Sequence, residues 1–131
     1  MRVVFDTNIL VAAIVFPGGE GEKALLRAIE GRDQLCMSQE ILDELLGVLA
    51  RKFARDAEQL ARVAVFLSEL AEFVKPRSRI SILTDEPDNR ILECALASRA
   101  QAIVTGDKAM LVLREYRGIR IESLSDYLNS E

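Results

Sequence analysis

The chain begins Met1-Arg-Val-Val-Phe-Asp-Thr-Asn-Ile-Leu10, and this stretch decides the fold. β-Branched and aromatic residues favour a strand, and a continuous apolar run suits a strand buried on both faces. The polar residues 6–8 then interrupt the run with side chains that commonly cap helices. We therefore expect a strand over residues 2–5 and a helix beginning near Ile9. Asp6 would then lie at the carboxyl end of a buried strand, where parallel sheets bind ligands.

Strands and helices alternate along the rest of the chain. Short apolar runs predict further strands at residues 34–37, 73–75, 102–105 and 119–121. Apolar residues at helical spacing predict helices over about 22–30, 39–51, 56–72, 87–99, 108–114 and 125–128. Such alternation is typical of an α/β fold, here a three-layer sandwich around a central, mostly parallel sheet of roughly five strands. With 131 residues and no linker, we expect one domain over residues 1–131.

The composition limits the classes of protein. The chain is 50% hydrophobic and 29% charged, which is ordinary for a soluble globular protein. We find no apolar run long enough for a membrane helix and no signal peptide, so we expect a cytoplasmic protein without a membrane partner. Cys36 and Cys94 stand in apolar segments and form no motif. We interpret them as small core residues in a reducing compartment.

The chain contains no histidine, which excludes Ser-His and Cys-His nucleophilic chemistry and His-ligated zinc. Carboxylates are plentiful and favour oxygen-liganded cations such as Mg²⁺ or Mn²⁺. The net charge of −4, from 17 basic and 21 acidic residues, argues against electrostatic wrapping of nucleic acid. If four acids hold a metal, the remaining 17 basic and 17 acidic residues balance, and the cation adds positive charge where a phosphate would arrive.

Four acidic residues are expected to meet at the carboxyl edge of the sheet. Asp6 follows the first strand, Asp107 follows the fourth, and Asp88 lies in the first turn of the helix that starts near Pro87. Glu44 lies on the helix predicted over 39–51. Carboxylates that close repel each other and need a cation between them.

Each of these residues also has a purely structural interpretation. Glu44 borders an apolar helix face and could bend outward to solvent. Asp88 could complement the helix macrodipole, and Asp6, Asp107 and Asn8 could be helix caps. Thr105 could be an ordinary hydroxyl at the end of a strand. Because one architecture brings all four acids together, we prefer a metal site.

Carboxylates around a divalent metal are well suited to hydrolysing phosphodiesters, because the metal activates water and polarises the phosphoryl oxygen. Without histidine, a carboxylate such as Asp88 or Asp107 would orient or deprotonate that water. Asn8 and Thr105 could hydrogen-bond the acidic ligands or a phosphate.

Four sequence blocks follow one another along the chain, and the resemblance that they carry extends over nearly its whole length: Val3-Val-Phe-Asp-Thr-Asn-Ile-Leu10, Ser38-Gln-Glu-Ile-Leu-Asp-Glu44, Asp85-Glu-Pro-Asp-Asn-Arg-Ile-Leu-Glu-Cys-Ala95 and Ala102-Ile-Val-Thr-Gly-Asp107. Together they resemble the PIN-domain ribonucleases. The resemblance implies that Mg²⁺ or Mn²⁺ is bound by the acids that match the family's motif, which here are Asp6, Glu44, Asp88 and Asp107.

The resemblance also implies cleavage of RNA with a 5′-phosphate and a 3′-hydroxyl as products. Small stand-alone members of the family are often VapC-like toxins of toxin–antitoxin pairs. Such proteins usually dimerise, and a cognate antitoxin inserts a segment into the active-site groove. Many members carry an acidic or polar residue two positions after the last Asp, where this chain has Ala109. The number of metal ions therefore stays open. The basic residues that are candidates for contact with the RNA phosphates are Arg90, Lys108, Arg51, Lys52 and Arg55.

Other functions compete with this interpretation. An aspartyl-phosphate phosphatase also begins with a strand ending in Asp, but it needs a second Asp two positions later, where this chain has Asn8. A non-catalytic protein of the same fold that binds RNA or dimerises is a second alternative. Among nucleases, a DNA substrate or a role in RNA maturation would leave no distinguishing mark in these residues.

Overall fold

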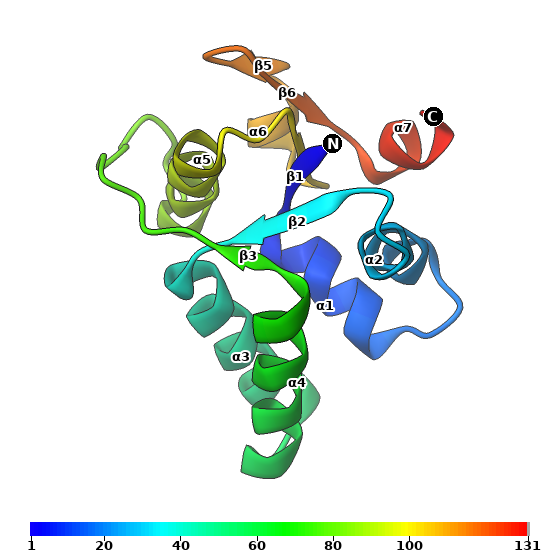
Figure 1. Ribbon diagram of the computed structural model, residues 1–131. Helices are drawn as coiled ribbons and strands as arrows, with labels where there is room; N and C mark the ends of the chain where they lie inside the picture. The colour runs from blue at the N-terminus through cyan, green and yellow to red at the C-terminus, as the bar shows by residue number, and fades with distance from the viewer. Residues whose placement is uncertain (131) are drawn as a thin grey trace.

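A six-stranded sheet forms the centre of the computed structural model, which describes residues 1–130 (Figure 1). The strand order is β3-β2-β1-β4-β6-β5, and every neighbouring pair is parallel except β5 and β6. The strands are β1 Arg2–Phe5, β2 Gln34–Met37, β3 Glu72–Phe73, β4 Ala102–Val104, β5 Glu115–Tyr116 and β6 Ile119–Glu122. This arrangement confirms the predicted α/β fold and its mostly parallel sheet.

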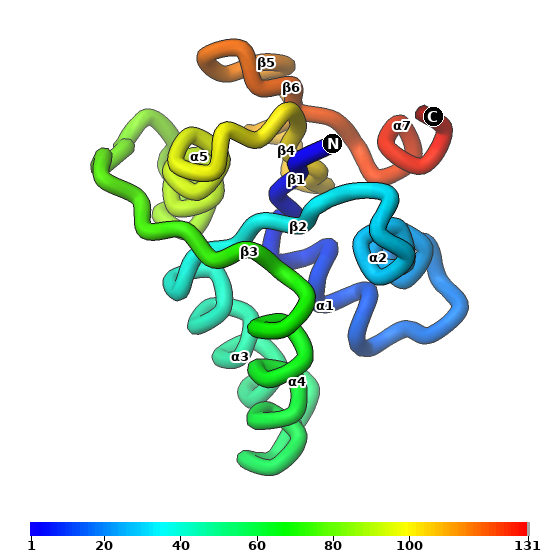
Figure 2. Tube along the Cα trace, in the orientation of Figure 1, coloured from blue at the N-terminus to red at the C-terminus, as the bar shows by residue number. Residues whose placement is uncertain are grey.

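Seven helices accompany the sheet in residues 1–130. They are α1 Thr7–Val15, α2 Glu20–Ile29, α3 Gln39–Phe53, α4 Ala57–Leu70, α5 Glu86–Ser98, α6 Lys108–Leu111 and α7 Leu124–Asn129. α5 packs against β1 and β2, while α1 packs against α2 and α3. α3 and α4 lie side by side and extend away from the sheet (Figures 1 and 2). None of these helices combines the length and the apolarity needed to cross a bilayer.

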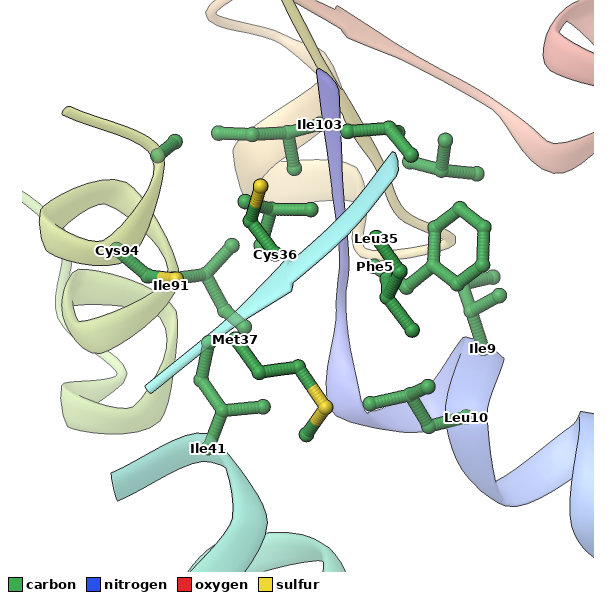
Figure 3. Close-up of a cluster of buried hydrophobic side chains, with 14 of the residues drawn as sticks. Phe5, Ile9, Leu10, Leu35, Cys36, Met37, Ile41, Ile91, Cys94 and Ile103 are labelled. Atoms are coloured by element: carbon green, nitrogen blue, oxygen red, sulfur yellow. The ribbon is translucent and has the colours of Figure 1, made fainter. Parts of the chain in front are cut away.

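β1 lies inside the sheet, paired with β2 on one side and with β4 on the other. Its side chains Val3, Val4 and Phe5 are almost completely buried, as the apolar run predicts, and α1 and α5 pack against the strand. The ring of Phe5 meets that of Tyr127 edge to face with centroids 5.6 Å apart. Figure 3 shows Phe5 with Leu35, Ile103 and Ile9 in this core.

The prediction of roughly five strands missed β5. Tyr116 pairs with Ile119, so only Arg117 and Gly118 connect β5 to β6. Both connecting residues have positive φ, at 50° and 84°, as a two-residue hairpin requires. Arginine is an unusual residue at the first of these positions, and β5 is only two residues long. The sequence therefore carries little signal for this hairpin, which adds an antiparallel strand at the edge of the sheet.

Candidate active site

Asp6 and Asp107 lie at the carboxyl ends of two neighbouring strands. The pairing of Phe5 with Val104 sets Asp6 beside Thr105, and the Asp6 N–H donates to the Val104 carbonyl at 2.9 Å. The Thr105 hydroxyl donates to Asp6 Oδ2 at 2.6 Å and accepts from the Asp107 N–H at 3.0 Å. Since Thr105 is fully buried, its hydroxyl fixes both acidic residues in place.

Asp107 also caps α6, as its structural interpretation predicts. Its Oδ1 accepts hydrogen bonds from the N–H groups of Ala109 and Met110, at 2.8 and 3.3 Å. Those bonds orient the carboxyl group and occupy one oxygen only. Oδ2 is left for another ligand.

Asp88 comes from the other side of the site, in the first turn of α5. Its side chain is only 4% exposed, although it belongs to the first turn of a helix that starts with Glu86 and Pro87. Asp88 Oδ2 is buried and has no hydrogen-bond partner within residues 1–130. A buried carboxylate oxygen without a partner is costly, which indicates that the arrangement is built for a ligand that supplies one.

Asp85 is a fourth member of the group, and the sequence did not single it out. Carboxylate oxygens of Asp85, Asp88 and Asp107 all lie within 4.8 Å of one another. Asp85 occupies the N-cap position of α5, but its side chain makes no capping hydrogen bond. An Asp at this position suggests a cap in any sequence, so only the three-dimensional arrangement distinguishes the two roles.

The negative charges of the group act on one another. Burial raises the pKa of Asp88 to about 7, and the nearby charges of Asp6 and Asp107 add to the rise. Burial raises the pKa of Asp6 as well, against the hydrogen bond from Thr105. Burial and mutual repulsion therefore both disfavour the ionised group, and a cation would relieve both.

Glu44 stands beside this group rather than within it. The half-buried Glu44, on α3, lines a hollow of about 390 Å³ together with Thr7 and Pro87. These two residues are the chain neighbours of Asp6 and Asp88, so the hollow adjoins the acidic group. Asn8 is exposed in the first turn of α1, and in the described part of the chain its side chain makes no hydrogen bond to the acids.

Arg90, a candidate phosphate contact, is instead buried. Its Nη2 donates to the Ile80 carbonyl at 2.8 Å and lies 3.2 Å from Glu93 Oε2. Lys108, Arg51 and Lys52 are exposed, as a phosphate contact or a solvated charge would be.

The donor set fits a hard divalent cation. Asp85, Asp88 and Asp107 offer only carboxylate oxygens at mutual distances that one ion can span, and Asp6 lies within electrostatic reach of Asp88. The unpartnered Asp88 Oδ2 is the kind of atom that such an ion would satisfy. Within residues 1–130 the cluster offers carboxylate oxygens alone, which are the donors that hard divalent cations prefer.

Comparison with known families agrees with this geometry. A family model described as the PIN domain matches residues 2–109, which include all the acidic residues discussed above. The chain belongs to the PIN-domain family. The family resemblance drawn from the four sequence blocks is thereby confirmed.

The individual proteins that resemble this PIN-domain protein share less than a third of its sequence. Uncharacterized protein MJ1680 of Methanocaldococcus jannaschii is 29% identical over 119 residues, which cover 88% of this chain and 76% of the relative. The crystal structure of VapBC2 from Rickettsia felis, bound to a DNA fragment from their promoter, contains a chain with 21% identity. It aligns with a TM-score of 0.65 over 94% of this chain and 98% of that chain.

VapBC-1 from nontypeable Haemophilus influenzae contains a second such chain. It is 20% identical, with a TM-score of 0.62 over 95% of this chain and 99% of that chain. At these levels of identity, both likenesses show that the fold is shared.

Proposed function

We propose that this PIN-domain protein is an endoribonuclease that depends on Mg²⁺ or Mn²⁺. The observation that carries the proposal is the convergence of Asp85, Asp88 and Asp107, one of which, Asp88, has a buried carboxylate oxygen without a partner. Asp6 adds a further negative charge from the end of β1. Membership of the PIN-domain family supports a nuclease acting on phosphodiester bonds.

Asp6, Asp88 and Asp107 would hold the metal, with Asp85 as an added ligand. Glu44 would reach the site from α3 across the adjoining hollow and would complete the set expected from the family motif. A divalent cation in such a site supplies Lewis acidity that makes water a better nucleophile and polarises the phosphoryl group.

The chain's own groups would position the reactants and move the proton. A carboxylate oxygen of Asp88 or Asp107 that does not bind the metal would orient or deprotonate the attacking water. Thr105 would keep the Asp6 carboxylate in one orientation. Asn8, exposed beside Asp6, would contact a phosphate oxygen of the RNA.

We further propose that the protein is the toxin of a toxin–antitoxin pair. Its fold is that of a chain in two VapBC complexes, and it extends over nearly the full length of both matched chains. An exposed apolar hollow of about 680 Å³, lined by Ile29, Val65, Phe66 and Leu70, supports contact with an antitoxin or a second copy of the chain. Free, buried Cys36 and Cys94 support a reducing compartment such as the cytoplasm.

Cleavage of a labelled single-stranded RNA by the purified protein tests the enzymatic proposal. We expect 5′-phosphate products with Mg²⁺ or Mn²⁺, and no cleavage in EDTA. Asp6→Asn and Asp107→Asn should abolish cleavage while circular dichroism shows an unchanged fold. Wild-type activity in either variant would overturn the site, and cleavage that persists in EDTA would overturn the metal requirement.

The toxin proposal is tested separately. We expect the protein to arrest growth when it is expressed alone, and we expect the product of a small neighbouring reading frame to relieve the arrest. Equal growth with and without expression of an active nuclease would contradict the toxin role.

A further inference from the structure

Residues 74–85 form a strap that connects β3 to α5 and passes along the outside of that helix (Figures 1 and 2). Buried polar side chains of α5 hold the strap in place. The Ile80 N–H donates to Glu93 Oε2 at 2.7 Å, and the Leu83 N–H donates to Asn89 Oδ1 at 2.9 Å. These bonds fix the second half of the strap against the helix.

A pocket of about 760 Å³ lies between the first half of the strap and the last turns of α5. It is lined by Val74, Lys75, Pro76, Arg77, Ser78, Glu93, Leu96, Ala97 and Arg99. We call it the strap pocket. Its volume falls within the range of about 300–1,000 Å³ that small-molecule sites occupy.

The accessible charge of the strap pocket is positive. Lys75, Arg77 and Arg99 are exposed at its rim, and none of them forms a salt bridge within residues 1–130. Glu93 is only 2% exposed and already binds Arg90 and the Ile80 N–H, so it presents almost no negative charge to a ligand. Three free cations therefore gather on a chain whose net charge is −4.

The lining of the strap pocket also includes apolar surface. Val74 and Pro76 contribute from the strap, and Leu96 and Ala97 from α5. Cations beside an apolar surface match a nucleotide, whose phosphate is anionic and whose base has two apolar faces. A free inorganic anion would contact the cationic side chains only and would leave the apolar lining without a partner.

The strap pocket lies within reach of a strand that passes through the acidic site. Asp88 and Leu96 are eight residues apart on α5, which is about 12 Å along the helix axis. Arg79 lies between the two places. It lines the hollow beside Glu44, and its Nη1 is 3.9 Å from Glu93 Oε1, a group of the strap pocket.

We propose that the strap pocket binds a nucleotide of the RNA substrate, a few positions away from the bond that is cleaved. The proposal rests on the ribonuclease function and adds a second point at which the strand is held. It assigns phosphate contacts outside the acidic site to Lys75, Arg77 and Arg99.

The test compares a strap variant, Lys75→Ala/Arg77→Ala/Arg99→Ala, with a control that removes the same charge elsewhere, Lys23→Ala/Arg62→Ala/Arg117→Ala. Fluorescence anisotropy would follow a labelled ten-nucleotide single-stranded RNA in EDTA at several salt concentrations. We expect the strap variant to bind at least tenfold more weakly than the control. The slope of log affinity against log salt should fall by about 2, since each phosphate contact on a single strand contributes about 0.7.

Two results would overturn the proposal: equal affinities of the two variants, or no measurable binding by the wild type. If AMP displaces the RNA when the two are present at similar concentrations, the pocket takes free nucleotides and the assignment to the strand is wrong.

Cleavage assays separate this proposal from the ribonuclease function. If RNA binding depends on the strap residues but no RNA is cleaved in Mg²⁺, the ribonuclease proposal is wrong and the RNA site in the strap pocket stands. If the strap variant cleaves ten-nucleotide RNA with the same rate and KM as the control, the strap-pocket proposal is wrong and the ribonuclease proposal stands.

Discussion

The Thr105 hydroxyl donates a 2.6 Å hydrogen bond to Asp6 Oδ2 and is fully buried. Replacing it with Thr105→Val keeps the shape but leaves a buried carboxylate oxygen and the Asp107 N–H without this partner. We expect a loss of about 1–3 kcal/mol in the free energy of unfolding. Metal affinity should fall by about 10–100-fold, the usual effect of losing a group that orients a ligand. Chemical denaturation and Mn²⁺ titration measure the two effects.

Thr105→Ser is the control, because it keeps the hydroxyl and should retain most of the stability and most of the Mn²⁺ affinity. Equal losses in Thr105→Val and Thr105→Ser would contradict the proposed orienting role of the hydroxyl.

Asp88 makes the stability of the metal-free protein dependent on pH. Its pKa is raised to about 7 in the folded chain from the ordinary 3.8, so between these values the folded state holds a proton that the unfolded state has lost. The free energy of unfolding must therefore decrease as pH rises through this window, and the decrease is complete above about pH 7. Thermal denaturation in EDTA should show a lower Tm at pH 8 than at pH 5.

Asp88→Asn should remove much of that decrease, so the variant should be more stable than the wild type at pH 8 in EDTA. Added Mg²⁺ should raise the Tm of the wild type and have little effect on Asp88→Asn. The exposed Asp126 provides a control, because Asp126→Asn should leave both the pH dependence and the Mg²⁺ effect intact. A wild-type Tm that does not change with pH would contradict the raised pKa of Asp88 in the folded chain.

How far the sequence predicts this structure depends on how local each signal is. β1 and Asp6 were predictable, because an apolar run that stops at Asp-Thr-Asn is a local pattern. The meeting of Asp6, Asp88 and Asp107 followed from parallel topology, and their catalytic role stays a prediction. β5 was missed because its hairpin depends on Arg117 in a left-handed conformation.

Two further residues needed the folded chain. Asp85 looks like any N-cap until Asp88 and Asp107 are placed next to it. Arg90 looks like an exposed cation in sequence, because only the strap folding over α5 buries it. In both cases the deciding contacts depend on the path of the strap. The strap is an irregular segment, so no periodic pattern in the sequence predicts where it runs.

Asp85 gives a direct test of the larger acidic group. Because its side chain makes no capping hydrogen bond, Asp85→Asn should cost α5 little stability. If the carboxylate is a metal ligand, Mn²⁺ affinity measured by calorimetry should fall by roughly tenfold or more. Asp56→Asn is the matched comparison, since Asp56 does cap α4 and lies outside the acidic cluster. Unchanged Mn²⁺ affinity in Asp85→Asn would remove Asp85 from the site.

Glu93 holds the strap to α5, and its removal should be far more costly than that of an exposed ion-pair partner. Glu93→Ala leaves the Ile80 N–H without its acceptor, and it removes from buried Arg90 the nearer of its two carboxylate partners, the other being Glu86 at 3.5 Å. Breaking a buried pair in this way costs about 3–5 kcal/mol. The comparison is Glu58→Ala, which breaks the exposed i,i+4 pair with Arg62 and should cost less than about 1 kcal/mol. Urea denaturation of both variants measures the difference, and equal costs would mean that the strap is not anchored through Glu93.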